Sequence, residues 1–220
     1  MFACHACLGR LRVVEHGEDC AGLRERKKIA TRAAISHAAI RLALRHGLEN
    51  VRVPDIAAEA DVAPRTYNNY FSSIPEAICA LASDRAMGIG DAVRQRPEGE
   101  PLAEAIANAM TGLDPSIGSD KDIVRMIVST PVLRGEFFKT VVARDAALAG
   151  AIAERVGAKP DDLFPQVLAA AYSSVTRVVT TRWLQSDDDT DYATMLRAAL
   201  DLVAPMAAAY QSAAYQCDER

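Results

Sequence analysis

The stretch from Val53 to Phe71, VPDIAAEADVAPRTYNNYF, constrains the fold more than any other part of this 220-residue chain. Its first half places Ile56, Ala57 and Ala60 on one side of a helix. These small residues make a narrow apolar face that another helix can approach closely. Pro54 suits the first turn of that helix, where a missing N–H costs nothing. The pattern therefore predicts a short helix that packs against a neighbour.

A turn at Asp61 separates this helix from a second one, which begins at Pro64. Asp tolerates the left-handed backbone conformation better than most residues. In the second helix Tyr67, Tyr70 and Phe71 lie three and four residues apart and can pack inward. The residues left to face outward are Arg65, Thr66, Asn68 and Asn69. Because Arg and Asn match the edges of guanine and adenine in the major groove, the pattern predicts a DNA-binding helix-turn-helix.

The composition predicts an all-α protein. Half of the residues are hydrophobic but only 5% are aromatic, and alternating runs of β-branched residues are nearly absent. We expect about nine helices. Besides the two of the helix-turn-helix, they span about Leu23–His46, Ile74–Arg94, Leu102–Thr111, Lys121–Ser129, Pro131–Val156, Leu163–Leu184 and Tyr192–Tyr210.

The segment RPEGEP at Arg96–Pro101 is the clearest break in this pattern and the expected domain boundary. The predicted organisation has four parts: a mobile tail over residues 1–22, a helix-turn-helix domain over 23–72, a connecting helix over 73–95 and a second helical domain over 96–220.

Charge is distributed unevenly along the chain. The segment from Ala21 to Ser72 holds nine Lys and Arg against five Asp and Glu, so it carries +4, while the whole chain carries −4. A basic segment of this kind is attracted to phosphate. Lys27, Lys28 and Arg32 are therefore candidates for contacts to the DNA backbone, and the alternative is a solvated charged helix end.

Cys4, Cys7, His16 and Cys20 have a spacing that could ligate zinc, but a mobile tail is the simpler interpretation, and we predict no metal and no cofactor. The cysteines are expected to be reduced. All four histidines lie before residue 47. We find no nucleophile elbow, carboxylate pair or metal motif beyond them, so an enzyme is not expected. Without a signal peptide or an apolar run of membrane-spanning length, we expect a cytoplasmic protein.

The motifs DIAAEADV and TYNNYF, followed by the S-x-x-E of Ser73 to Glu76, resemble TetR-type transcriptional regulators, particularly an actinobacterial subgroup. The resemblance covers roughly Leu23 to Tyr210 and is strongest from Ile35 to Ala77. It implies a homodimer, formed through the last two helices, that binds a palindromic operator. It also implies that the domain over 96–220 binds a small-molecule effector, whose binding relieves repression.

The resemblance also implies roles for individual residues. Pro64, Arg65, Thr66 and Asn68 match positions that contact bases, and Asn69 and Tyr70 match positions that contact bases or phosphate. The chain departs from the family pattern at Arg52, Asp61, Ala63 and Ile74. Arg52 stands where a Thr cap is common and can supply the positive charge that Ile74 lacks.

Candidates for the effector site are apolar or amphipathic residues on the later helices; the alternative is that they form ordinary core. They are Met110, Met126, Phe137, Phe138, Val141, Tyr172, Val175, Thr176, Val179 and Trp183. This lining favours a lipophilic effector, and Arg177 could pair with an anionic head group or lie at the surface. The expected function is a sequence-specific repressor released by its effector. The alternatives are a constitutive or architectural DNA-binding protein without an effector, and an activator.

Overall fold

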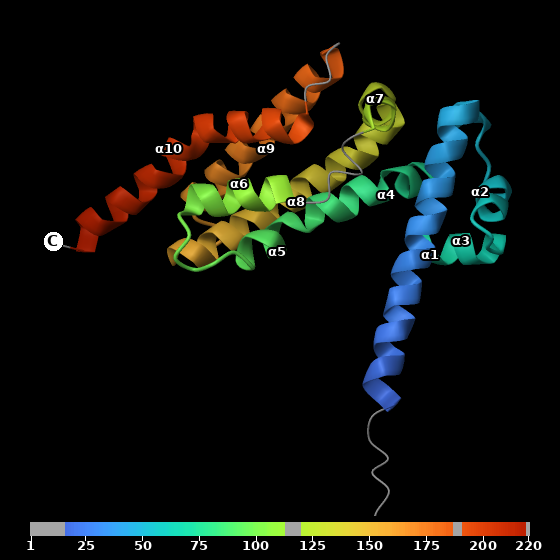
Figure 1. Ribbon diagram of the computed structural model, residues 1–220, viewed down its shortest axis with the longest axis horizontal. Coiled ribbons are helices and arrows are strands. Elements are labelled where there is room, and N and C mark those ends of the chain that lie inside the picture. The colour runs from blue at the N-terminus through green and yellow to red at the C-terminus, as the bar shows by residue number, and fades with distance from the viewer. Residues whose placement is uncertain (1–15, 113–119, 187–190, 219–220) are drawn as a thin grey trace, which may run out of the picture.

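The computed structural model describes residues 16–112, 120–186 and 191–218, and within them it contains helices and no strand (Figure 1). In chain order the elements are α1 (His16–His46), the 3-10 helix η1 (Leu48–Asn50), α2 (Val53–Glu59), α3 (Pro64–Tyr70), α4 (Ile74–Met87), α5 (Ile89–Arg94), α6 (Leu102–Gly112), α7 (Lys121–Ser129), α8 (Pro131–Val156), α9 (Leu163–Gln185) and α10 (Tyr192–Asp218). The predicted all-α fold is confirmed. One helix is added because the stretch predicted over Ile74–Arg94 is divided at Gly88.

The head, which we define as α1 to α3 with η1, packs around the second half of α1. Ile35 of α1, Ile56 of α2 and Tyr67 of α3 are at most 1% exposed and belong to one hydrophobic cluster. Ile127 of α7 and Leu133 of α8 join the same cluster. The core of the head is therefore shared with helices that come much later in the chain.

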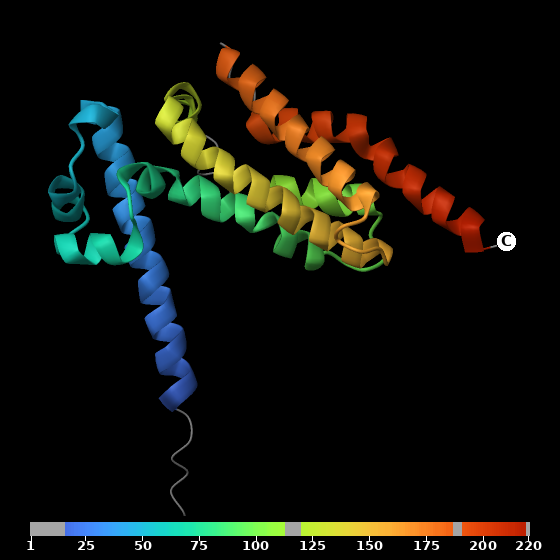
Figure 2. The same ribbon diagram turned by 180° about the vertical axis from the view of Figure 1, so that it is seen from behind.

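The body, which we define as α4 to α10, is organised around α8. This helix packs against α4, α5, α7 and α9, while α10 packs against α6 and α9. Figures 1 and 2 show the body as an elongated group of helices with the head at one end. Its core cluster includes Ile106, Leu148, Ile152, Leu168 and Leu200. None of the helices in the described residues is long and apolar enough to cross a bilayer.

Both long terminal helices extend further than the sequence pattern indicated. Helix α1 begins at His16, whereas the sequence pattern predicts a start at about Leu23 and a tail over residues 1–22. Residues 16–22 are therefore helical, and they contain no proline that would prevent this. Helix α10 continues past Tyr210 to Asp218. Cys4 and Cys7 of the possible zinc motif lie outside the described residues. Cys79 is a buried free thiol, and burial raises its pKa to about 12.

The boundary between the two hydrophobic clusters does not lie at the sequence break over Arg96–Pro101. Val93 of α5 and Leu102 of α6, which flank this break, belong to the same body cluster. The head cluster, in turn, extends along α4 as far as Ala80. Along the chain, the last buried residue of the head cluster on α4 is Ala80, and the first buried residue of the body cluster is Ile89. The domain limits at residues 72 and 96 stay predictions.

Gly90 allows α5 to approach α8 closely. A Cβ atom at this position would lie 2.8 Å from the backbone oxygen of Ala147, a separation that van der Waals contact does not permit. Glycine inside a helix lowers its stability, and this stretch holds two, Gly88 and Gly90. The structure shows that Gly88 joins α4 to α5 and that Gly90 lies at a helix contact.

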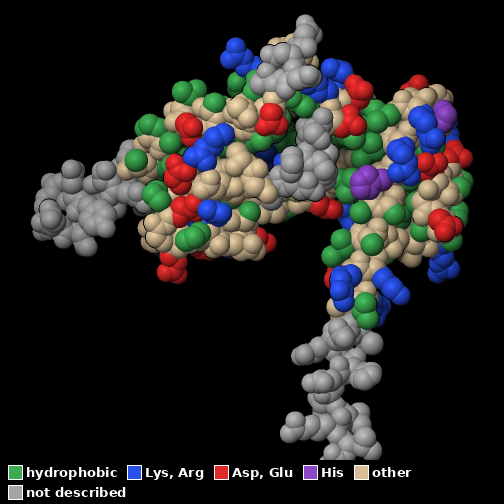
Figure 3. Space-filling model, viewed as in Figure 1, with side chains coloured by type: hydrophobic (Ala, Val, Ile, Leu, Met, Phe, Trp, Pro, Cys, Tyr) green, Lys and Arg blue, Asp and Glu red, His purple; other side chains and the backbone are tan. Residues whose placement is uncertain are grey.

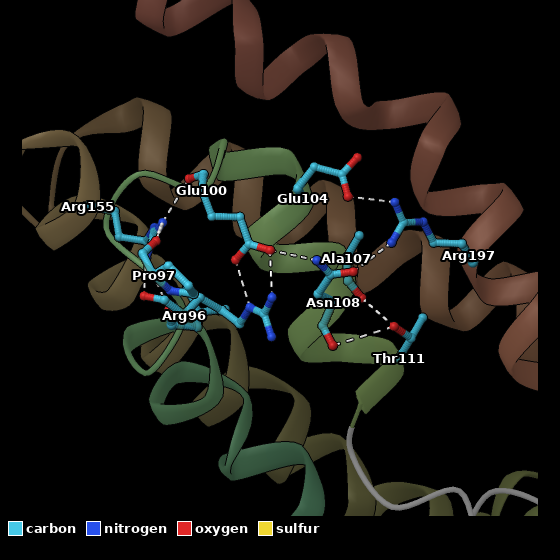
Figure 4. Close-up of polar contacts among 10 residues, drawn as sticks. Arg96, Pro97, Glu100, Glu104, Ala107, Asn108, Thr111, Arg155 and Arg197 are labelled. Atoms are coloured by element: carbon cyan, nitrogen blue, oxygen red, sulfur yellow. Dashed lines mark hydrogen bonds and ion pairs between the residues drawn. The ribbon is translucent and has the colours of Figure 1, made fainter.

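A polar network closes the turn between α5 and α6 (Figure 4). The guanidinium of Arg155, on α8, donates to the backbone carbonyls of Arg96, Pro97 and Glu100 at 3.1, 2.8 and 2.9 Å. It also lies 3.5 Å from the carbonyl oxygen of Val93. The turn has two backbone hydrogen bonds of its own, from Arg96 to Val93 and from Glu100 to Pro97. One side chain of α8 therefore supplements these bonds and reaches carbonyls that the backbone leaves free.

The network continues from this turn to α10. The Glu100 carboxylate accepts hydrogen bonds from Arg96, at 2.6 and 2.7 Å, and from Asn108 at 2.7 Å. Mainly because of the Arg96 hydrogen bonds, the pKa of Glu100 falls to about 2. Arg197 of α10 then donates to Asn108 at 2.8 Å and to Glu104 at 2.6 Å.

Candidate DNA-binding surface

The turn between α2 and α3 is built by backbone geometry. Asp61 has a φ of 54°, as its position in the motif indicated, and is the one non-glycine residue with positive φ in the described part of the chain. The N–H of Val62 donates to the carbonyl of Ala57 at 2.9 Å, which closes the end of α2. Helix α3 then begins with Pro64, whose fixed φ suits the first helical position.

One face of α3 is anchored in the core. Tyr67 and Phe71 are 1% and 2% exposed, as predicted for core residues. The Tyr67 hydroxyl donates to the carbonyl of Ser73 at 2.9 Å, and burial raises the pKa of Tyr67 to about 12. The opposite face is free, with Arg65 and Asn68 exposed.

The remaining residues predicted to contact DNA from this motif are also at the surface. Pro64 and Asn69 are exposed, and Thr66 and Tyr70 are half-buried. Arg52 is exposed and precedes α2; its guanidinium donates to the carbonyls of Glu49 and Val51 at 2.7 and 3.0 Å. Arg52 therefore stabilises the loop before α2 through hydrogen bonds, and its charge stays at the surface.

The basic residues of α1 divide into two groups. Lys27 and Lys28 are exposed on the part of α1 that projects from the head, where Figure 3 shows Lys and Arg side chains gathered. Lys28 lies 3.6 Å from Glu25, a contact that exposure makes weak. Arg32 differs, because its guanidinium is paired with Asp84 of α4 at 2.8 Å.

Sequence reasoning missed the ion pairs that hold α2 against α1. Arg41 and Arg45 of α1 donate to the two carboxylate oxygens of Glu59 at 2.9 and 3.1 Å. The Arg41 hydrogen bond, followed by that of Arg45, holds the pKa of Glu59 below its usual value. Arg41 and Arg45 are four residues apart, so they lie on one helix face, but nothing in the pattern named Glu59 as their common partner.

The S-x-x-E of Ser73 to Glu76 at the start of α4 differs slightly from a standard capping box, in which the serine and the glutamate cap each other. The Ser73 hydroxyl accepts from the N–H of Glu76 at 3.2 Å, as expected. The Glu76 carboxylate accepts from the N–H and the hydroxyl of Ser72 at 2.8 and 2.6 Å, so it caps one residue earlier than in the standard motif.

Helix α3 lacks a side-chain cap, because Ala63 stands at its N-cap with an extended backbone. Ala63→Ser is expected to raise the free energy of unfolding by about 1 kcal/mol, since a hydroxyl there can accept a hydrogen bond from the first turn of α3. Urea denaturation measures the change. An equal gain from Ala58→Ser, an exposed position within α2, would contradict a capping effect.

The residues predicted to bind an effector do not form one group. Met110 and Tyr172 lie in the body cluster, with Val175 and Val179, while Met126 and Phe137 pack against the head cluster. Trp183 is buried beside Tyr192, and the Lys121 ammonium lies 5.4 Å from its ring centre. Val141 and Thr176 are half-buried, whereas Phe138 and Arg177 are exposed. A cleft of about 730 Å³ opens between α1 and α2, and none of these residues lines it.

Two short helices joined by a tight turn, with exposed Arg and Asn on the second, define a helix-turn-helix DNA-binding protein. Comparisons with known proteins agree. The family model described as bacterial regulatory proteins of the tetR family matches residues 35–76, and the model described as MftR C-terminal domain matches residues 100–208.

Individual relatives cover most of the chain. The HTH-type transcriptional regulator TcmR of Streptomyces glaucescens is 30% identical over 200 residues, 84% of this chain and 87% of TcmR. MftR of Mycobacterium tuberculosis, provisionally named a mycofactocin biosynthesis transcriptional regulator, is 29% identical over 185 residues, 81% of this chain and 91% of MftR. The chain belongs to the TetR family of transcriptional regulators.

A solved structure shows the same fold. Thermus thermophilus FadR, a TetR-family transcriptional repressor crystallised with lauroyl-CoA, has a TM-score of 0.54 and 19% identity to this chain. The match covers 78% of this chain and 92% of FadR.

Proposed function

We propose that this TetR-family regulator is a sequence-specific repressor that binds a palindromic operator as a homodimer and releases it when a small lipophilic molecule binds the body. The DNA-binding step is supported mainly by one observation, which is that α3 has one buried face and one exposed polar face. Tyr67 and Phe71 fix one face in the core, and Arg65 and Asn68 project from the other. A rigidly held helix with exposed hydrogen-bonding side chains suits the major groove.

Arg65, Asn68, Pro64 and Thr66 would contact base edges, and Asn69 and Tyr70 bases or phosphate. Arg52, Lys27 and Lys28 would contact the DNA backbone. The exposure of Lys27 and Lys28 supports this assignment, because a phosphate contact needs a side chain that is free to reach the duplex. Arg52 is exposed too, and only its Nη1 atom donates to the carbonyls of Glu49 and Val51, so its guanidinium keeps other donors for a phosphate.

The exposed apolar surface of α9 and α10 supports the homodimer. Val167 and Val178 of α9 and Leu202 and Met206 of α10 are large apolar side chains at the surface, with Leu202 82% exposed. Large exposed apolar patches on the same pair of helices are typical of protein–protein interfaces. Sedimentation of the purified protein tests this step, and a monomer at micromolar concentration would contradict it.

The hydroxyl of Tyr172 is the best support within the chain for an effector. It is the one buried side-chain nitrogen or oxygen without a hydrogen-bond partner in the described residues. Burial raises the pKa of Tyr172 to about 12, so the group stays protonated and can donate. A buried donor without a partner is costly unless a ligand or water accepts from it. The lauroyl-CoA bound to FadR shows that a protein of this fold can hold an acyl chain.

Tyr172→Phe is expected to leave the effector-free protein as stable as the wild type or to stabilise it by about 1 kcal/mol, because the change removes an unpaired buried hydroxyl. The same change is expected to weaken effector binding. Thermal unfolding of delipidated protein measures the first effect. Native mass spectrometry of molecules that co-purify with the two proteins measures the second. A loss of stability in the delipidated protein would contradict an unpaired hydroxyl.

One experiment separates this function from its alternatives. Operator affinity is measured by fluorescence anisotropy before and after the co-purified small molecules are removed. We expect removal to strengthen binding. Unchanged affinity, with no bound molecule found, would favour a constitutive or architectural DNA-binding protein. A transcription reporter driven from the bound promoter distinguishes repression from activation.

A further inference from the structure

Arg32 connects three helices through one guanidinium group. The residue lies on α1, and its Nη1 atom donates to Oδ2 of Asp84 on α4 at 2.8 Å. Its Cζ atom lies 4.9 Å from the ring centre of Phe71, the residue that directly follows α3. The positively charged group therefore pairs with a carboxylate and lies over an aromatic ring at the same time, two interactions that a guanidinium makes well.

This arrangement leaves Arg32 less accessible than the basic residues before it on α1. Its side chain is 30% exposed, whereas the whole of residues 22–30 earlier on α1, with Lys27 and Lys28, is exposed. A phosphate contact by Arg32 would require the guanidinium to leave Asp84. The basic residues of α1 that were grouped together in the sequence therefore have different surroundings.

A second residue of α1 is also bonded to α4. Ser36, one turn further along α1, donates its buried hydroxyl to the carbonyl of Ala77. Asp84 lies two turns beyond Ala77 on α4. These two contacts connect α1 and α4 beside the apolar cluster that the two helices share. Because Phe71 packs on Tyr67, with ring centres 5.9 Å apart, the Arg32 contact also reaches the core-facing side of α3.

We propose that Arg32 is a positioning residue for operator binding, which holds α3 in a set orientation to α4 through Phe71 and Asp84 and makes no phosphate contact of its own. The proposal rests on the proposed function, in which the effector-free form binds the operator. Since α4 belongs to the body and also carries part of the head cluster, and the proposed dimer forms through the body, this orientation would set the distance between the two α3 helices on DNA.

A double-mutant cycle tests this role. Arg32→Ala, Asp84→Ala and the double variant are titrated, over a range of salt concentrations, against a duplex with the palindrome that the wild type protects and against a scrambled duplex. Each single variant is expected to weaken operator binding about three- to tenfold. The double variant is expected to bind the operator as well as the more strongly affected single variant does, because both changes remove the same contact. Affinity for the scrambled duplex and the salt dependence are expected to stay unchanged.

A phosphate contact would give a different result. Arg32→Ala alone would then weaken binding to both duplexes and reduce the slope of log K against log salt by about 0.9 for each head. Asp84→Ala would not weaken binding, since it would free Arg32. Lys28→Ala is the matched comparison and is expected to show that phosphate pattern.

Further controls show whether each variant is folded and whether the charge of Arg32 alone is enough for operator binding. Arg32→Lys keeps the charge but loses the guanidinium that lies over Phe71. Its operator affinity is therefore expected to lie between that of Arg32→Ala and that of the wild type. Thermal unfolding confirms that each variant is folded at the assay temperature, and Asp84→Asn replaces Asp84→Ala if the latter is not. If the wild type protects no palindrome, both the proposed function and the role of Arg32 are overturned. If the wild type protects a palindrome but the effects of Arg32→Ala and Asp84→Ala on operator affinity add up in the double variant, only the role of Arg32 is overturned.

Discussion

Arg65→Ala is expected to weaken specific operator binding by about 1–3 kcal/mol at each half-site. Arg65 lies in the first turn of α3, where helix-turn-helix proteins place their base contacts, and its side chain is exposed. A homodimer carries the change in both heads, so Kd is expected to rise by a factor of about 30 or more. Asn68→Ala is expected to act similarly and to relax the base preference at a different position of each half-site.

Fluorescence anisotropy at a fixed salt concentration measures these losses, and circular dichroism checks that helicity is unchanged. Lys159→Ala is the control, because it removes one positive charge from an exposed position at the turn between α8 and α9, far from the head (Figure 1). An Arg65→Ala variant that binds its operator like the wild type would show that α3 does not recognise bases through this residue.

Arg155→Ala is expected to have the largest effect on stability among the polar residues of the body, a loss of about 2–4 kcal/mol in the free energy of unfolding. Arg155 donates to carbonyls of Arg96, Pro97 and Glu100, and a charged donor is worth more than a neutral one. Its removal takes away the side-chain donor of the Arg96 and Glu100 carbonyls, whereas the Pro97 carbonyl keeps the N–H of Glu100 at 3.1 Å. Denaturation with urea measures the loss.

Arg155→Lys separates charge from geometry in the same experiment. A lysine keeps the charge, but a single ammonium cannot span carbonyls that the planar guanidinium reaches together, so we expect at least half of the loss to remain. Arg125→Ala serves as the control for removing an exposed arginine and is expected to change stability by less than about 0.5 kcal/mol. Equal stability of Arg155→Ala and wild type would show that water replaces the network without cost.

The parts of the fold that depend on local sequence were predictable. Pro64 starts α3, and the spacing of Tyr67 and Phe71 indicates which side of that helix is buried. Gly47 and Gly157 follow α1 and α8 with φ values of 80° and 68°, as expected of residues that end helices. Each of these features is determined by residues within one or two helical turns of it.

The contacts that the sequence pattern missed join residues far apart in the chain. Arg32 was grouped with its basic neighbours because its partner, Asp84, is 52 residues away. Arg155 is a basic residue in the last turn of α8, and its partners are 55 or more residues away. Periodicity shows which face of a helix is buried, but it does not identify the residue on the opposing helix. For the same reason, a run of apolar residues could not show which of them lie together, and the effector candidates fell into separate clusters.

The measurement that tests the central claim most directly is a nuclease protection experiment on the DNA flanking the gene for this protein. The account predicts protection of a palindrome whose half-sites are separated by a whole number of helical turns, about 34–36 Å or a multiple, on one face of the duplex. It also predicts that Arg65→Ala abolishes this protection at the concentration at which the wild type gives it fully. Absence of any palindromic protection, or protection that is the same for both proteins, would contradict the claim that α3 reads an operator.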